Sequence, residues 1–488
     1  MPSIAHRSQA RIAALALAAA VLAVVPAGAT SAHAATRCAL ANGLLEVHMT
    51  ESGDNASFAV ANGTIGISGR TSTVTCTGGT PTTRTVDTVL VVDDSDKVST
   101  PAGNDGTTTV SIIEPGLFGP GKTEEPFSED EIEFLVDTRN GSDNLTIGGQ
   151  GQQRIVVGND GLNWNFDEDR DVIGMPFDDI RVFGSSGHND FLSGRGGDGT
   201  GPALSTATFF GILPFSGDDI VLGSDIPAGD SLEGGDGNDM IEGFAGPDTI
   251  NGGPGNDTLD GAAGDDTVIP SIGDDTIRGG ADSDTVDFRF AGNGVNVDLA
   301  RSGAQATGEG SDSFADVENV TGSQLFGDRL SGTAGANVLD GIGGGDVLEG
   351  RGGADELRGG DGSDTVSYAG AAGPVTVDLA RITQSGGERL NSIENAAGSP
   401  FADLLTGNAV ANVISGGAGA DTIAAADGDD RVELRDGEGD RAACGAGADS
   451  VVADRRSLDA VEADCETVDA LAEPEPEPQP GGSGGAPD

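Results

Sequence analysis

Apolar residues return at a fixed interval of nine along much of the second half of the chain. In one stretch they are Ile241, Ile250, Leu259, Val268, Ile277 and Val286. The residues between them are mostly Gly, Asp and other polar types, without helical periodicity. Short apolar segments bounded by Gly- and Asp-rich breaks predict brief strands separated by turns. A strict short period also predicts a solenoid, because one unit alone cannot bury its apolar side chain.

Aspartates follow the same period, two residues before each apolar position. The first run contains Asp239, Asp248, Asp257, Asp266, Asp275 and Asp284 without a slip. The second run contains Asp328, Asn337, Asp346, Asp355 and Asp364, and the third contains Asp403, Asn412, Asp421 and Asp430. Asp440 then comes one residue late, and Asp449 resumes the interval. Acids placed this regularly argue against a solvated low-complexity linker.

Two copies of a longer segment separate the runs. VNVDLAR at Val295–Arg301 returns as VTVDLAR at Val375–Arg381, and ENVTGS at Glu318–Ser323 returns as ENAAGS at Glu394–Ser399. Both copies are expected to be strand-bearing spacers. Upstream, β-forming segments between Gly, Asp and Pro breaks predict a distinct N-terminal β domain.

The N-terminus has the features of an export signal. Arg7 and Arg11 precede an apolar stretch at residues 12–25, and the small-x-small triplet at 32–34 fits a cleavage site before Ala35. This stretch is shorter than the roughly 20 apolar residues that span a bilayer, which disfavours a membrane anchor. The mature protein is predicted to be secreted and extracellular, without membrane insertion.

Charge narrows the choice of partners. The chain has 80 Asp and Glu against 25 Lys and Arg, a formal net charge of −55. Such a chain is repelled by nucleic acids and anionic membranes, so neither is expected as a partner. It is a favourable host for hard cations. Acidic, Gly-rich chains can be disordered, but here the acids are periodic rather than scattered.

The turn hexamers have the composition of a calcium site. The best copies read GGDGND at Gly234–Asp239, GGPGND at Gly252–Asp257, GGDGSD at Gly359–Asp364 and GGAGAD at Gly416–Asp421. Glycine permits positive φ and lets carbonyl groups point inward, and Asp and carbonyl oxygens are the donors that Ca²⁺ prefers. These hexamers resemble the repeats-in-toxin (RTX) family, whose repeat is G-G-x-G-x-D-x-U-x with U apolar. The whole arrangement is similar to secreted actinobacterial members of that family.

The resemblance implies both fold and function. In RTX repeats the hexamer is a turn, the other three residues form a strand, and successive strands enter two parallel sheets alternately, so that residue i stacks on residue i+18. The expected fold is all-β, a parallel β-roll or β-solenoid of nonapeptide repeats with an N-terminal β domain. The expected function is extracellular binding of multiple calcium ions, with calcium-dependent folding. The candidate ligands are Asp239, Asp248, Asp257, Asp266, Asp275, Asp284, Asp328, Asp346, Asp355, Asp364, Asp403, Asp421, Asp430 and Asp449.

The predicted segments follow these features in order. They are a signal peptide at 1–34, an N-terminal β domain at 35–138, degenerate Gly/Asp repeats at 139–233, the first run at 234–290, a spacer at 291–322, the second run at 323–368, a spacer at 369–397, the third run with a C-terminal cap at 398–470, and a disordered Pro/Glu/Gly tail at 471–488.

Stacking is expected to make the ion necessary for folding. Asp239 and Asp257 would lie one strand spacing apart, about 4.8 Å, where like charges repel by about 1 kcal/mol in water and about 3–4 at an effective dielectric near 20. One small apolar residue per repeat buries too little to offset the ordering of nine residues at about 1–2 kcal/mol each. A cation between the turns would convert this repulsion into attraction.

Several turns depart from the pattern. Phe244 and Pro270 replace turn glycines, and Asn337 and Asn412 stand where Asp is expected. These turns are expected to bind more weakly, and Asp at either Asn position is expected to tighten binding. Asp284 is expected to end its stack, because the residue 18 positions later is a serine within the spacer.

The four cysteines are Cys38, Cys76, Cys444 and Cys465. An even number in an exported chain suggests two disulfides, with three connectivities open. Proximity favours Cys38–Cys76 and Cys444–Cys465, and the segment around the second pair resembles the disulfide-closed cap of RTX chains. Their spacing does not fit a tetrahedral zinc site.

Catalysis is not expected. The predicted mature chain has only His48 and His188 and no H-E-x-x-H motif. The G-x-S-x-G string at Gly481–Gly485 lies in the predicted tail, with no strand before it and no helix after it. The alternative function is a calcium-rigidified adhesin or matrix protein that presents its N-terminal domain to a cell-surface or matrix partner.

One acidic segment outside the runs has its own alternatives. Asp167, Asp169 and Asp171 resemble the start of an EF-hand loop, but Val172 stands where that loop needs Gly. A calcium site of another type and a plain acidic turn are both open.

Overall fold

The described part of the protein is built from β-strands. The computed structural model describes residues 209–471 apart from 385 and 456, residues 190–195, and the strands of the segment 36–183. These residues belong to one compact unit, Thr36–Asp488. None of them forms a helix long and apolar enough to cross a membrane. The predicted signal peptide and the tail from residue 472 lie outside the described residues.

Four sheets carry nearly all of the strands. Sheet 1 has the order β1 (Thr36–Ala41), β2 (Leu44–Met49), β5 (Thr88–Asp93), β7 (Glu133–Asp137), β11 (Val172–Ile173), β10 (Gly161–Asn163), β9 (Arg154–Gly158), β13 (Phe191–Ser193), β15 (Ile220–Leu222), β17 (Met240–Ala245), β19 (Thr258–Ala263), β21 (Thr276–Ala281), β25 (Ser311–Ala315) and β24 (Gln305–Ala306). Sheet 2 has the order β35 (Arg389–Asn391), β31 (Glu356–Arg358), β28 (Val338–Asp340), β26 (Asn319–Thr321), β22 (Thr285–Asp287), β20 (Thr267–Ile269), β18 (Thr249–Asn251), β16 (Asp230–Glu233), β14 (Phe209–Leu213), β12 (Asp179–Phe183), β8 (Ser142–Gly148), β6 (Thr107–Ile113), β3 (Asn55–Ala61) and β4 (Thr64–Ser68).

The remaining strands follow the first spacer. Sheet 3 has the order β23 (Asn296–Asp298), β27 (Arg329–Ser331), β30 (Val347–Glu349), β33 (Thr365–Ser367), β36 (Asn395–Ala397), β38 (Val413–Ser415), β40 (Arg431–Glu433), β42 (Ser450–Ala453) and β44 (Thr467–Ala470). Sheet 4 has the order β34 (Thr376–Asp378), β37 (Leu404–Thr406), β39 (Thr422–Ala424), β41 (Arg441–Ala443) and β43 (Ala460–Val461). A two-stranded ribbon joins β29 (Gly343–Gly344) and β32 (Asp361–Gly362).

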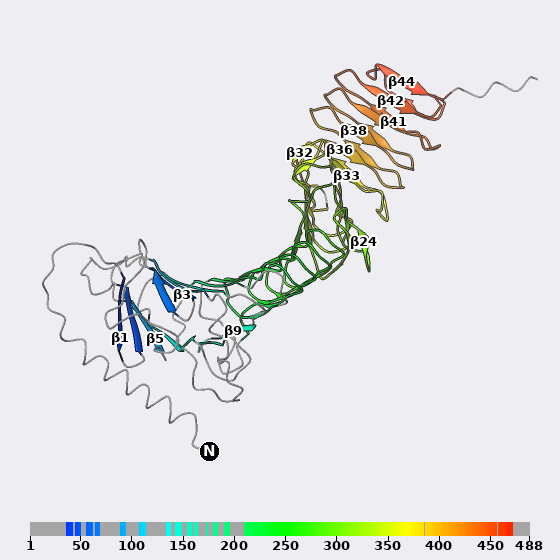
Figure 1. Ribbon diagram of the computed structural model, residues 1–488. Helices are drawn as coiled ribbons and strands as arrows, with labels where there is room; N and C mark the ends of the chain where they lie inside the picture. Colours follow the sequence, from blue (N-terminus) through cyan, green and yellow to red (C-terminus); the bar gives the residue numbers. More distant parts are fainter. Residues whose placement is uncertain are drawn as a thin grey trace, which may run out of the picture. The chain divides into compact units, whose positions relative to one another are not determined.

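The repeats stack in the expected register. In sheet 1, Met240 pairs with Thr258 and Thr258 with Thr276, while in sheet 2 Thr249 pairs with Thr267. Each step is 18 residues, because alternate repeats enter alternate sheets. All of these pairings are parallel. Figure 1 shows β36, β38, β42 and β44 in this order along sheet 3, in which β40 pairs with both β38 and β42. The predicted parallel β-solenoid of nonapeptide repeats is confirmed.

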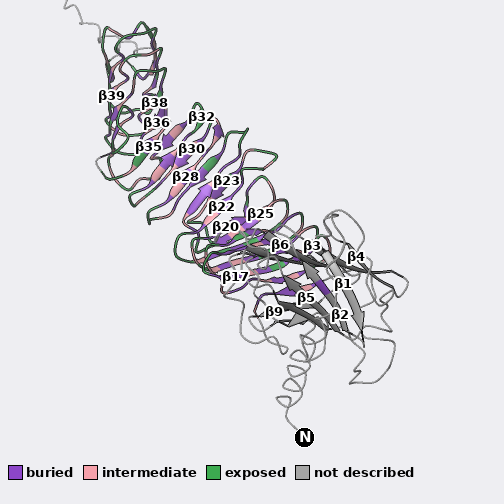
Figure 2. Cartoon of the chain, turned by 90° about the vertical axis from the view of Figure 1, so that its left-hand side faces the viewer, coloured by how far each residue is buried: buried purple, intermediate pink, exposed green. Residues whose placement is uncertain are grey.

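The core is a single file of apolar side chains per sheet. Its members in the runs are Ile241, Ile250, Leu259, Val268, Ile277, Val286, Leu330, Leu339, Leu348, Leu357, Val366, Leu405, Ile414, Ile423, Val432 and Val451, and each is at most 1% exposed. Most three-residue strands bury only their central residue, so that Figure 2 shows buried positions along the strands and exposed ones on the turns. One residue per nonapeptide therefore forms most of the core, as the periodicity predicts, and in the third run Ala425 and Leu434 are buried as well.

Each spacer replaces one sheet while the other runs through. At the first spacer sheet 1 ends and β23 starts sheet 3, whereas sheet 2 continues from β22 through β26 to β28. At the second spacer sheet 2 ends and β34 starts sheet 4, whereas sheet 3 continues from β33 through β36 to β38. The spacers are strand-bearing, as expected, and they hold the two sheets of successive runs in one continuous stack.

A buried glutamine seals the edge of each new sheet. Gln305 accepts a hydrogen bond from the Asp298 amide (2.9 Å) and donates one to the Asp298 carbonyl (3.0 Å). Gln384 makes the same pair of bonds with Asp378, at 2.9 and 3.0 Å. The side chain thus occupies the backbone groups that a neighbouring strand would otherwise use, which protects an open edge.

Upstream of the runs, the strands belong to the same two sheets. In sheet 1, β2, β5 and β7 pair in parallel, and in sheet 2 β3, β6, β8 and β12 do so. Pairing of β6 with β8 carries sheet 2 across residue 138. The predicted N-terminal domain and the other domain limits stay predictions.

Candidate metal centre

The repeat aspartates form hydrogen-bonded ladders along each sheet. The amide of Asp239 donates to Oδ1 of Asp257 (2.8 Å), and the amide of Asp257 donates to Oδ1 of Asp275 (2.8 Å). The same bond links Asp248 to Asp266 (2.8 Å) and Asp266 to Asp284 (2.9 Å) on the other sheet. Each such aspartate is one rung of the ladder, and one of its carboxylate oxygens binds the amide of the preceding rung. The expected repulsion between neighbouring carboxylates remains, since the charges of Asp230 and Asp266 raise the pKa of Asp248.

Among the residues that the structure describes, twelve of these aspartates have a buried second carboxylate oxygen, Oδ2, without a hydrogen-bond donor. They are Asp219, Asp239, Asp248, Asp257, Asp266, Asp275, Asp284, Asp346, Asp364, Asp421, Asp430 and Asp449, each at most 2% exposed. An uncompensated buried carboxylate costs several kcal/mol. We call the turns that carry such an oxygen open turns.

Burial raises the pKa of these carboxylates. The pKa of Asp248 rises to about 8, those of Asp275 and Asp346 to about 7, and those of Asp257 and Asp284 to about 6. Desolvation is the main cause in each case, and the amide of the preceding rung opposes it. Each group lacks a positive partner that would favour the ionised form.

The first glycine of the hexamer makes room for this oxygen. A methyl group on Gly252 would lie 2.3 Å from Oδ2 of Asp257, and one on Gly416 would lie 2.3 Å from Oδ2 of Asp421. In these turns the glycine brings its own backbone against the carboxylate, whereas Pro270 and Ala425 occupy the same position in the open turns of Asp275 and Asp430.

The second residue of every open turn has a left-handed backbone. These residues are Phe215, Gly235, Phe244, Gly253, Ala262, Ser271, Gly280, Ile342, Gly360, Gly417, Ala426 and Gly445, with φ between 64° and 123°. A residue with a side chain pays roughly 1–2 kcal/mol for this conformation. At Phe244, Ala262, Ile342 and Ala426 the chain therefore keeps a strained turn and an uncovered carboxylate together.

Other turns satisfy the ladder residue with their own chain. The Ser399 amide donates to Oδ2 of Asp403 (2.5 Å) and its hydroxyl donates to Oδ1 (2.7 Å). Ser224 binds Asp230, and Ser323 binds Asp328, in the same two ways. None of these three serines has positive φ. We call turns in which the chain covers the ladder residue in this way closed turns.

The two asparagines also lie in closed turns. Oδ1 of Asn337 accepts the Thr333 amide (2.7 Å), and its Nδ2 donates to the Glu318 carbonyl (2.6 Å). Oδ1 of Asn412 accepts the Asn408 amide (2.9 Å), and its Nδ2 donates to the Glu394 carbonyl (2.6 Å). An aspartate here would place a second oxygen against that carbonyl, so the expected gain from Asp at these positions does not follow.

Glutamates of the spacers continue the ladders, which the sequence reading missed. The Asp284 amide donates to Oε2 of Glu318 (3.0 Å), and the Asp364 amide donates to Oε2 of Glu394 (3.0 Å). The expectation that Asp284 ends its stack was therefore wrong, because the spacer loops out and returns a glutamate to the vacant rung. The duplicated ENVTGS and ENAAGS motifs contained the signal for this role.

Further rungs come from aspartates outside the interval of nine. Oδ1 of Asp312 accepts the Asp275 amide (2.9 Å), and Oδ1 of Asp440 accepts the Asp421 amide (2.8 Å). Oδ1 of Asp459 accepts the Asp440 amide at 3.2 Å. Asp355, a predicted ligand, does keep the interval, and it accepts the Asn337 amide at 2.9 Å. Insertions lengthen the turns and leave the strand register intact, so the interval alone could not reveal these rungs.

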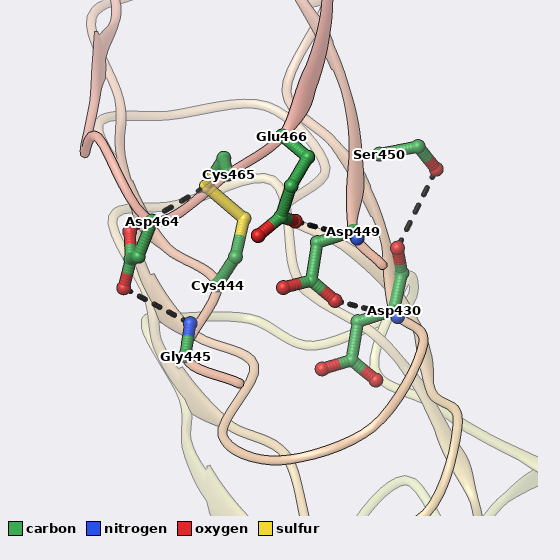
Figure 3. The surroundings of a disulfide bond; sticks show 8 residues. All are labelled: Asp430, Cys444, Gly445, Asp449, Ser450, Asp464, Cys465 and Glu466. Atoms are coloured by element: carbon green, nitrogen blue, oxygen red, sulfur yellow. Dashed lines mark hydrogen bonds between the residues drawn. A yellow bond between two sulfur atoms is a disulfide. The ribbon is translucent and has the colours of Figure 1, made fainter. Parts of the chain in front are cut away.

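The C-terminal end combines a disulfide with the last rungs. Cys444 and Cys465 are joined, as expected (Figure 3). Beside them the Asp430 amide donates to Asp449 (2.9 Å), and the Asp449 amide donates to Oε2 of Glu466 (2.9 Å). The side chains of the other expected pair, Cys38 and Cys76, lie outside the described residues, as do Asp167, Asp169 and Asp171.

The donor set of the open turns fits a hard cation. Every uncovered atom in the ladders is a carboxylate oxygen, the ligand type that Ca²⁺ prefers. Within the part of the chain that the structure describes, no three His, Cys, Asp or Glu side chains converge on one point. The carboxylates are instead spread one per rung along each ladder.

The chain was compared with known proteins. The family model for the RTX calcium-binding nonapeptide repeat (4 copies) matches residues 233–268, 271–289, 325–344, 340–370 and 398–437. No curated protein matches the chain. The matched segments cover the three runs, including most of their open turns. Residues 233–437 of this chain therefore carry RTX calcium-binding nonapeptide repeats, arranged as a β-solenoid, and these repeats suggest calcium binding.

Proposed function

We propose that the protein is an extracellular calcium-binding scaffold whose open turns hold the ions and whose solenoid folds in response to calcium. The observation that carries this proposal is the row of buried Oδ2 atoms without a donor, one per open turn. Calcium supplies positive charge and accepts six to eight oxygen ligands. Two neighbouring carboxylates in a ladder would provide the acidic ligands, and backbone carbonyl groups would provide others.

Strain supports the same conclusion. A left-handed Phe244 or Ile342 and an uncovered Asp persist only where something else stabilises the turn. Closed turns of the same solenoid avoid both costs, so the open form is not imposed by the fold. A bound cation would compensate both the buried charge and the backbone strain.

The matched repeats also bear on the compartment. RTX repeat proteins are typically secreted, and the predicted leader at residues 1–34 agrees with export. Millimolar extracellular calcium would keep modules of this type loaded, since such modules bind at about 0.1–1 mM. The role we propose for the repeats is structural and not catalytic.

Calcium titration of the full mature chain, followed by circular dichroism, tests the proposal. We expect β structure to appear cooperatively as calcium rises through about 0.1–1 mM, and to disappear with a chelator at neutral pH. Magnesium is expected to substitute poorly, because it resists dehydration and requires octahedral geometry. An unchanged β signal in calcium-stripped protein at neutral pH would refute calcium-dependent folding.

A further inference from the structure

The starts of the second and third runs are built differently from their interiors. Each run begins with two closed turns, one on the sheet that starts there and one on the sheet that runs through. In the second run they centre on Asp328 and Asn337, and in the third on Asp403 and Asn412. We name these four turns the junction turns.

We propose that the junction turns bind no calcium and join successive runs through hydrogen bonds of the chain itself, so that the ions are confined to the open turns. This inference rests on the proposed calcium function, which it deepens by stating which rungs bind. It removes Asp328 and Asp403 from the ligands expected from the sequence.

On the newly started sheet, the chain itself surrounds the carboxylate. Oδ1 of Asp403 accepts the Val375 amide of the spacer strand (2.7 Å) and the Ser399 hydroxyl (2.7 Å), and Oδ2 accepts the Ser399 amide (2.5 Å). In open turns the corresponding Oδ2 has no donor. The Ser399 amide therefore binds the oxygen that an open turn leaves uncovered. The positive end of this N–H group would also repel a cation at that oxygen.

On the continuing sheet, the acid is replaced by a neutral amide. Asn412 lacks the charge that attracts a cation, and its Nδ2 donates to the Glu394 carbonyl at 2.6 Å. Its Oδ1 accepts the Asn408 amide at 2.9 Å. Asn337 repeats both bonds at the first junction. Both polar atoms are thus used by the chain, which leaves no ligand for an ion.

The two junctions agree in every one of these features. Each has a Glu rung, an Asn that binds the carbonyl of that Glu, a Ser that covers an Asp, and a Gln that seals the new strand edge. Open turns vary in sequence at the same positions yet retain the bare oxygen. Repetition of the whole arrangement indicates a common function, which we take to be connection of the runs independently of the metal.

Neighbouring rungs of one ladder provide a matched test. Asp403 and Asp421 lie on the same sheet, and the Asp403 amide donates to Oδ1 of Asp421 at 2.8 Å. We would count calcium bound to the full chain at saturation by equilibrium dialysis, for wild type, Asp403→Asn and Asp421→Asn. We expect Asp421→Asn to lower the count and to raise the half-saturating concentration roughly tenfold, as loss of a charged ligand does. Asp403→Asn should keep the wild-type count, with a lower melting temperature.

The outcomes separate the two proposals. An equal drop in ion count for Asp403→Asn and Asp421→Asn would refute the junction turns while leaving calcium binding intact. A wild-type chain that binds no calcium would refute the proposed function itself. Should Asp403→Asn fail to fold, the corresponding pair at the first junction, Asp328→Asn and Asp346→Asn, decides the question by the same count.

Ser399 gives an independent measurement. Ser399→Gly removes the hydroxyl and supplies the residue type that open turns favour at this position. If the serine closes the turn, this variant is expected to gain affinity for an additional ion. An ion count that stays at the wild-type value, together with an unchanged melting temperature, would show that the serine does not control the turn.

Discussion

The first run and the second junction differ in how they accommodate the buried ladder side chain. Both must bury an acidic or amide side chain beside a narrow core, with one rung every 18 residues. In the first run every turn leaves a carboxylate oxygen uncovered and keeps its second residue left-handed. At the junction around residues 369–415, Ser399 and Asn408 cover the same position with backbone amides. The solenoid can therefore fold with satisfied turns, and open turns are a local feature of the sequence.

The contrast locates the proposed metal requirement in the second residue of the turn. Ser399 lies in the ordinary backbone region and turns its amide toward the carboxylate, whereas Gly417 in the next turn of the same sheet has φ of 92° and does not. The acid is similar in both turns. What differs is whether the chain itself supplies the donor.

The largest expected effect is the pH response of the calcium-free protein. Burial raises the pKa of Asp248 to about 8 and that of Asp275 to about 7. A raised pKa in the folded state means that folding takes up protons, so stability is greatest below about pH 4 and is lost as pH rises through about 6 to 8. Calcium-stripped protein should show more β structure by circular dichroism near pH 5 than near pH 8.

Excess calcium supplies the control for this response. If protons and calcium compensate the same carboxylates, saturating calcium should abolish the pH dependence between about 5 and 8. A calcium-stripped protein that gains β structure on raising the pH would contradict open turns as the source of instability.

Next in size is the loss of a single open rung. Asp257→Ala leaves the Asp239 amide without its acceptor, and Asp284→Ala does the same to the Asp266 amide. Each buried orphan costs about 1–3 kcal/mol, and a ligand is lost as well. Because Glu318 continues the stack beyond Asp284, we expect similar increases in the calcium midpoint for both variants.

An exposed neighbour tests the specificity of that effect. Asp236→Ala removes one negative charge from an exposed position of a first-run turn, so calorimetric titration should show little change. A much smaller shift for Asp284→Ala than for Asp257→Ala would mean that the glutamate rung does not couple the spacer to the run.

Most of the ladder could be predicted from the sequence, because its periodicity is a direct consequence of stacking. The buried file from Ile241 to Val286 and the register of 18 follow from the interval of nine. What could not be predicted is how each carboxylate is satisfied. Glu318 accepts the Asp284 amide although the spacer breaks the interval of nine. Asn412 is interpreted from the sequence as a weaker calcium ligand, and only its bond to the Glu394 carbonyl shows another role. Both depend on contacts between residues that no local pattern brings together.

A smaller effect is expected at the junction asparagine. Asn412→Asp places a carboxylate oxygen 2.6 Å from the Glu394 carbonyl in place of the Nδ2 donor. Leaving a buried acceptor unsatisfied costs about 1–3 kcal/mol, so chemical denaturation in saturating calcium should show a less stable protein. Asn412→Ser, which keeps a hydroxyl donor, is the milder control. A tighter calcium titration for Asn412→Asp, without loss of stability, would restore the simpler view that these positions are weakened calcium sites.

The smallest expected effect concerns the strain in an open turn. Ile342 is a β-branched residue with φ of 64°, a conformation that costs about 1–2 kcal/mol for a side chain. Ile342→Gly removes this cost, although glycine gains about 0.5–1 kcal/mol of conformational freedom in the unfolded chain. The net result should be a gain of about 0.5–1 kcal/mol in stability and a slightly lower calcium midpoint. Ile342→Ala keeps a Cβ atom and therefore most of the penalty, so it should gain less than the glycine variant in the same calcium titration. Equal midpoints for wild type, Ile342→Ala and Ile342→Gly would show that the left-handed residue is not strained, and that covering the carboxylate is the whole difference between open and closed turns.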